Sequence, residues 1–123
     1  MSAPSVLPPC PAKPNCVSSQ APAADAGHYI EPLRFNGDPA TAWARLRQAL
    51  AAMPRTRIVE DSGQYLRAEA TSRVFRFVDD LECLMDRDAG VIHVRSASRV
   101  GHGDMGVNRK RVEKLRALMG AGA

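Results

Sequence analysis

Aromatic residues and cysteines are scarce in this sequence. Phe, Trp and Tyr make up 5% of the 123 residues, and the cysteines are Cys10, Cys16 and Cys83. An odd number of cysteines argues against the disulfide framework of a small secreted domain. Hydrophobic residues still reach 45%, so a core built mostly from Val, Leu, Ile, Met and Ala can form. The length suits one domain.

Long apolar runs are also absent. No stretch approaches the roughly 20 apolar residues of a membrane-spanning helix. The first residues, MSAPSVLPP, contain neither a positive region nor the apolar run of a secretory signal. We therefore expect a soluble, cytoplasmic protein with no membrane span.

Metal-ligand spacing is missing around Cys10 and Cys16, which lie six residues apart with no CxxC pair or further ligands nearby. We expect single thiols at these positions, with a Cys10–Cys16 disulfide as the alternative under oxidation. The sequence contains no Walker or dinucleotide fingerprint either. We therefore expect no metal and no other cofactor.

Proline is concentrated near the start of the chain. Six of the nine prolines fall within residues 1–28, and proline fixes φ and removes an N–H donor. We expect residues 1–28 to be an extended segment without regular structure and residues 29–123 to form a single domain. Within the segment, we expect Asn15–Ser19 to dock on the domain, because Asn and Ser side chains bond readily to backbone groups.

The first half of the domain contains sequence patterns for a strand, a helix and a hairpin, in that order. Residues 29–35 predict a strand. Asp38 followed by Pro39 predicts a helix start, and the helix is expected to run to about Met53 with Trp43, Leu46, Leu50 and Met53 buried. Residues 57–61 and 65–71 predict a hairpin with its turn at Ser62–Gly63.

A second hairpin is predicted from Phe75 onward, with its turn at residues 87–90 and Gly90 in a positive-φ position. Alternation places Asp79 on the apolar face with Phe75, Phe77, Leu81, Cys83 and Met85. The return strand, 92–100, places Ser96 and Ser98 on that face. A final helix is expected with Asn108 as its N-cap and Val112, Leu115 and Leu118 or Met119 on its buried side. This order, β-α-β-β-β-β-α, predicts an α+β fold with helices on one face of a small antiparallel sheet.

Asp79 is the most unusual polar residue in this pattern. A buried carboxylate is costly unless it is hydrogen-bonded, and Ser96 and Ser98 are available as donors. We expect a structural polar network, with a role as a catalytic acid or base as the alternative.

The opposite face of the hairpin carries Asp80, Glu82, Arg95 and Arg99. With the turn at 87–90, we expect Met85 to face Ile92, Glu82 to face Arg95 and Asp79 to face Ser98. A two-residue slip, which keeps the same faces, would instead place Asp80 opposite Arg95. The main expectation is cross-strand ion pairs on a solvated sheet surface. The alternative is an anion-binding face formed by Arg95 and Arg99.

Basic residues dominate the C-terminal part, and the formal net charge is +4. The last helix contains Arg109, Lys110, Arg111, Lys114 and Arg116, but no interleaved aromatic residues or nucleic-acid-binding motif. We expect a solvated helix face and no specific nucleic-acid binding. The glycine-rich loop at 101–106 is expected to be a flexible connection, or alternatively an anion-binding loop.

Four ordered motifs give the chain a family resemblance. They are PNCVSS at 14–19, RFVDD at 76–80, RSASRVG at 95–101 and DMGVNRKR at 104–111. They resemble domain-of-unknown-function family 1499 over nearly the whole chain. The family has no established activity to transfer, but the resemblance implies that the four motifs assemble into one site.

The resulting hypothesis is a non-catalytic binding or accessory module for a polar or anionic small ligand or partner. Its candidate ligand-binding residues are Asn15, Cys16, Ser18, Ser19, Asp79, Arg95, Ser96, Ser98, Arg99, Asp104, Asn108 and Arg109. The candidate partners are an anionic small molecule and an acidic protein surface. One alternative is a small hydrolase or thiol-dependent enzyme that uses Cys16 or Asp79. The other is a weak binder of nucleic acid or an acidic partner through the last helix.

Overall fold

The structure, a computed structural model, describes residues 5–120. Its elements in chain order are β1 (Cys16–Ser18), β2 (Leu33–Arg34), α1 (Pro39–Ala51), β3 (Thr56–Asp61), β4 (Tyr65–Thr71), β5 (Val78–Asp86), β6 (Val91–Ser98) and α2 (Val107–Gly120). Within the described residues, neither helix is long and apolar enough to cross a membrane.

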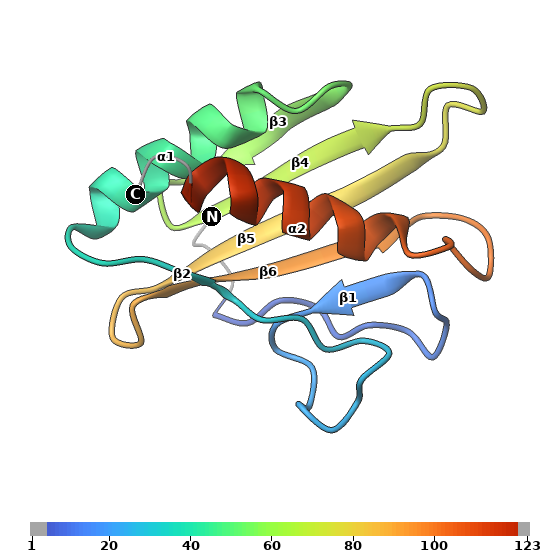
Figure 1. The fold of residues 1–123 in the computed structure, drawn as a ribbon, viewed down its shortest axis with the longest axis horizontal. Helices are drawn as coiled ribbons and strands as arrows, with labels where there is room; N and C mark the ends of the chain where they lie inside the picture. Colours follow the sequence, from blue (N-terminus) through green and yellow to red (C-terminus); the bar gives the residue numbers. More distant parts are fainter. Residues whose placement is uncertain (1–4, 121–123) are drawn as a thin grey trace.

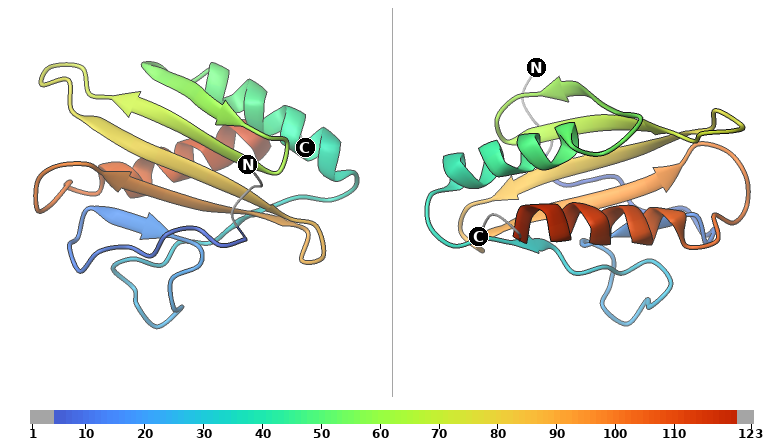
Figure 2. Two further views of the ribbon diagram at one scale, coloured as in Figure 1. Left: turned by 180° about the vertical axis from the view of Figure 1, so that it is seen from behind. Right: turned by 45° about the horizontal axis from the view of Figure 1, so that its top comes forward.

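The six strands form one antiparallel sheet in the order β1-β6-β5-β4-β3, and β2 pairs with β6 beside β1. Both helices lie across one face of this sheet (Figures 1 and 2). The predicted α+β class and the helices on one face are confirmed. The observed order is β-β-α-β-β-β-β-α, because β1 adds a strand before those expected.

The strand β1 corrects the expectation that no regular structure forms in residues 1–28. Cys16, Val17 and Ser18 pair with Ala97, Ser96 and Arg95 of β6, so β1 forms the edge of the sheet on this side. These three residues fall between Pro14 and Pro22, so each keeps the N–H group that a strand ladder requires. The high proline content of the rest of the segment led to the prediction that it contains no strand.

The predicted strand at 29–35 is wrong in its length. Only Leu33 and Arg34 pair with β6, and Tyr29 forms a single isolated bridge with Ser18. Pro32 lies between them and has no N–H to donate to a ladder, so the segment cannot pair continuously.

The other elements follow local signals. The Asp38 carboxylate accepts a hydrogen bond from the Thr41 amide at 3.0 Å, which makes Asp38 the N-cap of α1 as predicted. Gly90 closes the β5–β6 hairpin with a φ of 67°, and the pairs Met85–Ile92, Glu82–Arg95 and Asp79–Ser98 confirm the predicted register.

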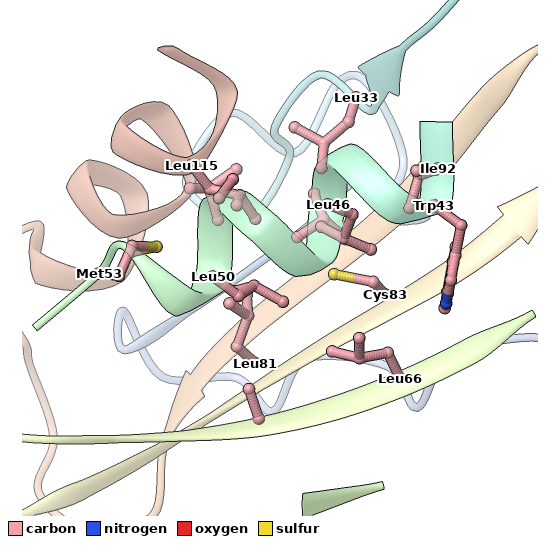
Figure 3. Packing of buried hydrophobic residues seen from close by; sticks show 14 of the residues in the cluster. Leu33, Trp43, Leu46, Leu50, Met53, Leu66, Leu81, Cys83, Ile92 and Leu115 are labelled. Carbon is pink, nitrogen blue, oxygen red and sulfur yellow. The ribbon is translucent and has the colours of Figure 1, made fainter. Parts of the chain in front are cut away.

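The main core lies between the helices and the sheet (Figure 3). The predicted stripe of α1 is confirmed, since Trp43, Leu46, Leu50 and Met53 are all buried. They pack with Leu66, Leu81, Cys83, Ile92 and Val94 from the sheet and with Val112 and Leu115 from α2. The apolar stripes at helical and strand spacing therefore meet in one core.

Phe75 and Phe77 do not belong to this core, which corrects the predicted alternation at its start. Their exposed fractions are 74% and 52%. The last residue of β4, Thr71, pairs with Val78. Residues 72–77 therefore form the connection between β4 and β5 and have no strand to pair with. Backbone and side-chain hydrogen bonds between Ser72 and Phe77, both 2.8 Å, close this loop.

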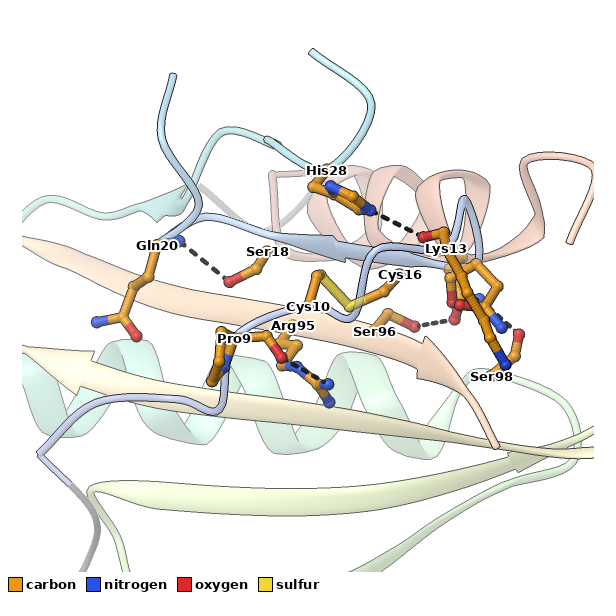
Figure 4. The surroundings of a disulfide bond; sticks show 12 residues. Pro9, Cys10, Lys13, Cys16, Ser18, Gln20, His28, Arg95, Ser96 and Ser98 are labelled. Atoms are coloured by element: carbon orange, nitrogen blue, oxygen red, sulfur yellow. Dashed lines mark hydrogen bonds between the residues drawn. A yellow bond between two sulfur atoms is a disulfide. The ribbon is translucent and has the colours of Figure 1, made fainter. Parts of the chain in front are cut away.

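The second face of the sheet is partly covered by the N-terminal segment. Leu7 packs with Tyr65 and Leu84 in a smaller cluster, and the Pro9 carbonyl accepts a hydrogen bond from Arg95 at 3.2 Å. A disulfide joins Cys10 in this segment to Cys16 in β1 (Figure 4). The alternative of a disulfide, rather than single thiols, is therefore the one observed.

Because the N-terminal segment covers part of the second face of the sheet, the prediction of a solvated surface with cross-strand ion pairs is only partly correct. Glu82 is buried, and it accepts hydrogen bonds from the Tyr65 hydroxyl at 2.7 Å and from Arg95 at 3.3 Å. Asp80 lies farther along the same face and is only partly exposed. Burial and the neighbouring Glu82 carboxylate raise the pKa of Tyr65.

Candidate functional site

A buried polar network connects the start of α2 with the sheet, and Asn108 is its centre. Asn108 is 0% exposed. Its amide nitrogen donates to the Ser98 hydroxyl at 2.9 Å, the Asp104 carboxylate at 2.8 Å and the Asn15 carbonyl at 3.2 Å. Its side-chain oxygen accepts a hydrogen bond from the Ser96 hydroxyl at 2.6 Å. Asn108 is thus a residue of the helix and a network centre, and its predicted role as N-cap is wrong.

Asp104 performs the capping function instead. Its carboxylate accepts hydrogen bonds from the backbone amides of Gly106 at 2.9 Å and Asn108 at 3.1 Å. Burial alone would raise the pKa of Asp104, but the hydrogen bonds from Asn108 and Gly106 outweigh it and lower that pKa. Asp104 therefore holds the glycine-rich loop closed against α2 as an ionised carboxylate.

Asp79 is buried on the helix-covered face, as predicted, but its partner is Arg111. The guanidinium Nη2 of Arg111 lies 2.8 Å from the Asp79 carboxylate. The same guanidinium donates to Asn108 at 2.7 Å and to Ser96 at 3.2 Å. The prediction that Ser96 and Ser98 donate to Asp79 is therefore wrong. Arg111 and Asn108 are three residues apart on a helix, which directs both side chains to the same face.

Asn15 ties the N-terminal segment to the network. Its side-chain nitrogen donates to the Gly101 carbonyl at 2.8 Å, and its own carbonyl accepts the Ser98 amide at 3.0 Å. Residues from all four sequence motifs therefore meet here. They are Asn15, Asp79, Ser96, Ser98, Asp104 and Asn108, joined by Arg111.

The remaining β1 candidates lie outside this network. Cys16 is bonded to Cys10. The Ser19 hydroxyl accepts a hydrogen bond from the Val94 amide at 2.9 Å and lies 3.1 Å from a ring nitrogen of His93. The Ser18 hydroxyl accepts the Gln20 amide at 3.1 Å (Figure 4). The Ser19 hydroxyl and the β1–β6 pairing fasten the N-terminal segment to the sheet, whereas the Ser18 hydroxyl stabilises the turn after β1.

The candidate arginines are also separate from the network. Arg95 and Arg99 lie on the other face of the sheet, where Arg95 binds Glu82 and Arg99 binds Asp80 and Glu69. The Arg99 guanidinium lowers the pKa of both carboxyl groups to which it donates. Arg109 donates to the carbonyls of Ala26 and Tyr29. All three guanidinium groups already have partners within the chain.

A cleft of about 920 Å³ opens beside the network. It lies between the β4–β5 loop, the end of α1, the β6–α2 loop and the first turns of α2. Asp79, Ser98 and Arg111 line its inner part. Phe75, Phe77, Val100, Met105 and Val107 contribute apolar surface, and Lys110 and Lys114 line one side. The network therefore forms part of the cleft wall and orders the loop above it.

Sequence reasoning missed most of the cleft. It assigned the two phenylalanines to the core and Lys110, Arg111 and Lys114 to a solvated helix surface. The spacing of the two lysines, four residues apart on a helix, did carry a signal, because such residues share one face. Nothing local indicated which part of the sheet that face would meet.

Within residues 5–120, no group of three or more His, Cys, Asp and Glu side chains is arranged to hold a metal ion. The arrangement offers instead a mixed apolar and cationic surface next to a polar network whose side chains bond mainly to one another.

Comparison with known proteins identifies one match. The profile of a family described as protein of unknown function (DUF1499) matches residues 6–119. This match confirms the resemblance carried by the four motifs. A search of curated proteins found no match.

Proposed function

The chain belongs to the DUF1499 family of proteins of unknown function, and from the cleft we propose that it is a non-catalytic binding module for a small amphipathic anion. One observation carries the proposal: the cleft combines apolar walls with two lysines that have no ionic partner within residues 5–120. Small-molecule sites are typically clefts of about 300–1,000 Å³ with mainly apolar walls and a few polar groups.

The apolar part of the ligand would lie against side chains from two loops. Phe75 and Phe77 come from the β4–β5 loop, and Val100 and Met105 come from the β6–α2 loop. The two phenyl rings are stacked, with their centroids 5.6 Å apart. Such a pair offers a broad apolar surface to a ligand chain or ring.

The anionic group would lie near α2. Lys110 and Lys114 are exposed on the cleft side of this helix. Arg111, between them, is neutralised by Asp79. Lys110 and Lys114 therefore supply positive charge on the α2 side of the cleft, and the Asp79–Arg111 pair forms part of the adjoining wall.

The enzymatic alternative receives less support. A thiol-dependent enzyme would need a thiolate at Cys16, but that sulfur is bonded to Cys10. The carboxylate of Asp79 already has Arg111 as its partner. The binder of nucleic acid is also less supported, because Arg109, Arg111 and Arg116 contact groups of the chain itself.

Isothermal titration calorimetry with three probes tests the proposal. Dodecyl phosphate, used below its micelle concentration, combines the two expected features. Dodecyl maltoside has the same alkyl chain without the charge, and inorganic phosphate has the charge without the chain. We expect dodecyl phosphate to bind at least about tenfold more tightly than either, because each half of the interaction contributes more than about 1.4 kcal/mol. Equal binding of the phosphate and maltoside detergents would overturn the proposal.

Substitution of the cleft lysines provides the second arm of this test. Lys110→Glu and Lys114→Glu should each weaken dodecyl phosphate binding by severalfold, because they reverse a charge beside the anion. Lys13→Glu is the matched control, since Lys13 is exposed on the N-terminal segment outside the cleft. Equal loss in all three variants would indicate only a general effect of net charge and would contradict the site.

A further inference from the structure

Exposed apolar side chains are concentrated at one end of the molecule. Within residues 5–120, seven large hydrophobic side chains are exposed. Six of them come from the β4–β5 loop, the β6–α2 loop and the first residue of α2: Val74, Phe75, Phe77, Val100, Met105 and Val107. Both loops extend from the same end of the sheet, on the right in Figure 1, and the other views agree (Figure 2).

The backbone presents these side chains at some conformational cost. Arg76 has a φ of 60° and Met105 a φ of 55°, values that are uncommon for residues other than glycine. Met105 is 94% exposed, so no packing contact explains its conformation. Such outliers often occur at functional loops, where the surrounding structure maintains them.

The charge around the two loops is positive. Arg73 and Arg76 flank Phe75 in the β4–β5 loop, and Lys110 and Lys114 lie on the neighbouring side of α2. The acidic residue of the β6–α2 loop is Asp104, whose carboxylate is occupied by the amides at the start of α2. The loops therefore combine apolar tips with a cationic surround, as peripheral membrane-binding surfaces do.

We propose that these two loop tips dock on the surface of an anionic lipid bilayer, with Val74, Phe75 and Met105 inserted among the lipids. A bilayer accepts apolar side chains from two separate tips at once, and its anionic headgroups complement the four cations around them. A single peptide ligand would instead need one continuous groove across the tips. The proposal extends beyond the function of the cleft and does not require a ligand inside it.

Val74 distinguishes the docking surface from the cleft. It is 76% exposed and does not line the cleft, whereas its neighbour Phe75 does. A change at Val74 should therefore affect membrane docking and leave binding inside the cleft intact. Val6, on the N-terminal segment, is 65% exposed and is its matched control.

Vesicle co-sedimentation is the test. The probes are vesicles of phosphatidylcholine alone and of phosphatidylcholine mixed with phosphatidylglycerol. The unaltered chain should partition onto the mixed vesicles, less onto the neutral ones, and less again at high salt. Val74→Asp and Met105→Asp should each reduce partitioning about tenfold, since an inserted apolar side chain is replaced by a charge. Val6→Asp should leave it unchanged.

Charge reversal provides an independent arm. Arg76→Glu, at a loop tip, should weaken partitioning onto the mixed vesicles. Arg87→Glu is its control, because Arg87 is exposed in the β5–β6 turn at the other end of the sheet. The circular dichroism spectrum of each variant reports whether it is folded.

The outcomes separate this proposal from the preceding one. Loss of vesicle binding in Val74→Asp with retained dodecyl phosphate binding supports docking. Dodecyl phosphate binding without any vesicle binding overturns docking and leaves the cleft proposal standing. Equal losses for Val74→Asp and Val6→Asp, or for Arg76→Glu and Arg87→Glu, also overturn docking. So does preference for an acidic amphipathic peptide over the mixed vesicles, because it identifies a protein partner.

Discussion

Asp79 and Arg111 form a largely buried ion pair between the sheet and α2. Their side chains are 11% and 13% exposed. Removing one member of such a pair leaves the other charge buried without its partner, which usually costs more than the pair itself contributes. Asp80, the next residue in β5, differs in environment. Its carboxylate bonds to Arg67 and Arg99 on the other face, where its side chain is 24% exposed.

These environments predict unequal effects of two neighbouring substitutions. Asp79→Ala should lower the free energy of unfolding by about 3 kcal/mol, the size expected when a buried pair is broken. Asp80→Ala should lower it by about 1 kcal/mol, because the ion pairs it removes are partly solvated. Urea unfolding of both variants measures the difference.

A double substitution tests the cause at Asp79. In Asp79→Ala/Arg111→Met the unpaired charge is gone, so part of the lost stability should return. If the double variant is less stable than Asp79→Ala alone, the remaining bonds from Arg111 to Ser96 and Asn108 dominate instead. Equal losses for Asp79→Ala and Asp80→Ala would contradict the asymmetry between the two faces.

The imidazole ring of His28 holds the segment that precedes β2 in place. His28 Nδ1 lies 2.8 Å from the Asp25 carboxylate. Its Nε2 lies 2.8 Å from the Lys13 carbonyl (Figure 4). Both partners are acceptors, so only a protonated ring can donate to both at once. The bonds to Lys13 and Asp25 accordingly raise the pKa of His28 above its ordinary value of 6.5.

This geometry predicts a pH-dependent attachment of residues 13–28. Because the pKa of His28 is higher in the folded state, its contribution is fully present below pH 6.5 and is lost as pH rises through the raised pKa. A titration of the His28 ring signals by NMR measures that pKa. Amide exchange at Ser18, which donates to the His28 carbonyl at 2.7 Å, should accelerate over the same range after correction for intrinsic rates.

The Asp25→Asn variant is the control for this titration. It removes the carboxylate and keeps the side-chain size, so the pKa of His28 should fall. An unchanged pKa would mean that the Lys13 carbonyl alone accounts for the shift. A His28 pKa below 6.5 in the unaltered chain would contradict the proposed double donation.

The whole molecule is a sheet with helices over one face and the N-terminal segment over part of the other. The cover on the second face is thin: Leu7 packs on Tyr65 and Leu84, and the Leu7 amide bonds to Gln20 at 2.8 Å. The Cys10–Cys16 disulfide connects this cover to the edge of the sheet. Beneath it lie the buried Glu82 and the half-buried Arg95.

Reduction of the disulfide should therefore loosen the second face and spare the first. Closing so short a loop limits the unfolded chain and stabilises the fold by about 2 kcal/mol. With dithiothreitol, amide exchange at Leu7 should accelerate, while exchange in β4 and β5 stays slow. Hydrogen exchange with mass spectrometry at peptide resolution measures both.

The variant Cys10→Ser/Cys16→Ser controls for other effects of the reductant. It should resemble the reduced chain and should not respond to dithiothreitol. Cys83 is buried in the main core, where burial raises the pKa of its thiol, so it should not react in the folded protein. Unchanged exchange at Leu7 after reduction would show that packing alone holds the segment.

The sequence by itself determined the local structure. Period-two alternation from Leu81 onward established which face of β5 carries Asp79, and Asp38–Pro39 and Gly90 marked a helix start and a turn. These features depend on residues adjacent in the chain, whose side-chain directions follow from backbone geometry alone. The turn at 87–90 favoured the observed register of the last hairpin, but a two-residue slip would have kept the same faces, so the structure decided between the two registers.

Only the tertiary structure decided what each face meets. Arg111, which follows Asp79 by 32 residues in the sequence, became its partner because α2 packs across the sheet there. Cys16–Ser18 became a strand because β6 had an open edge, and Phe75 and Phe77 stayed outside the core because β4 ends at Thr71. Contacts between residues far apart in sequence depend on how whole elements pack, and no local pattern encodes that arrangement.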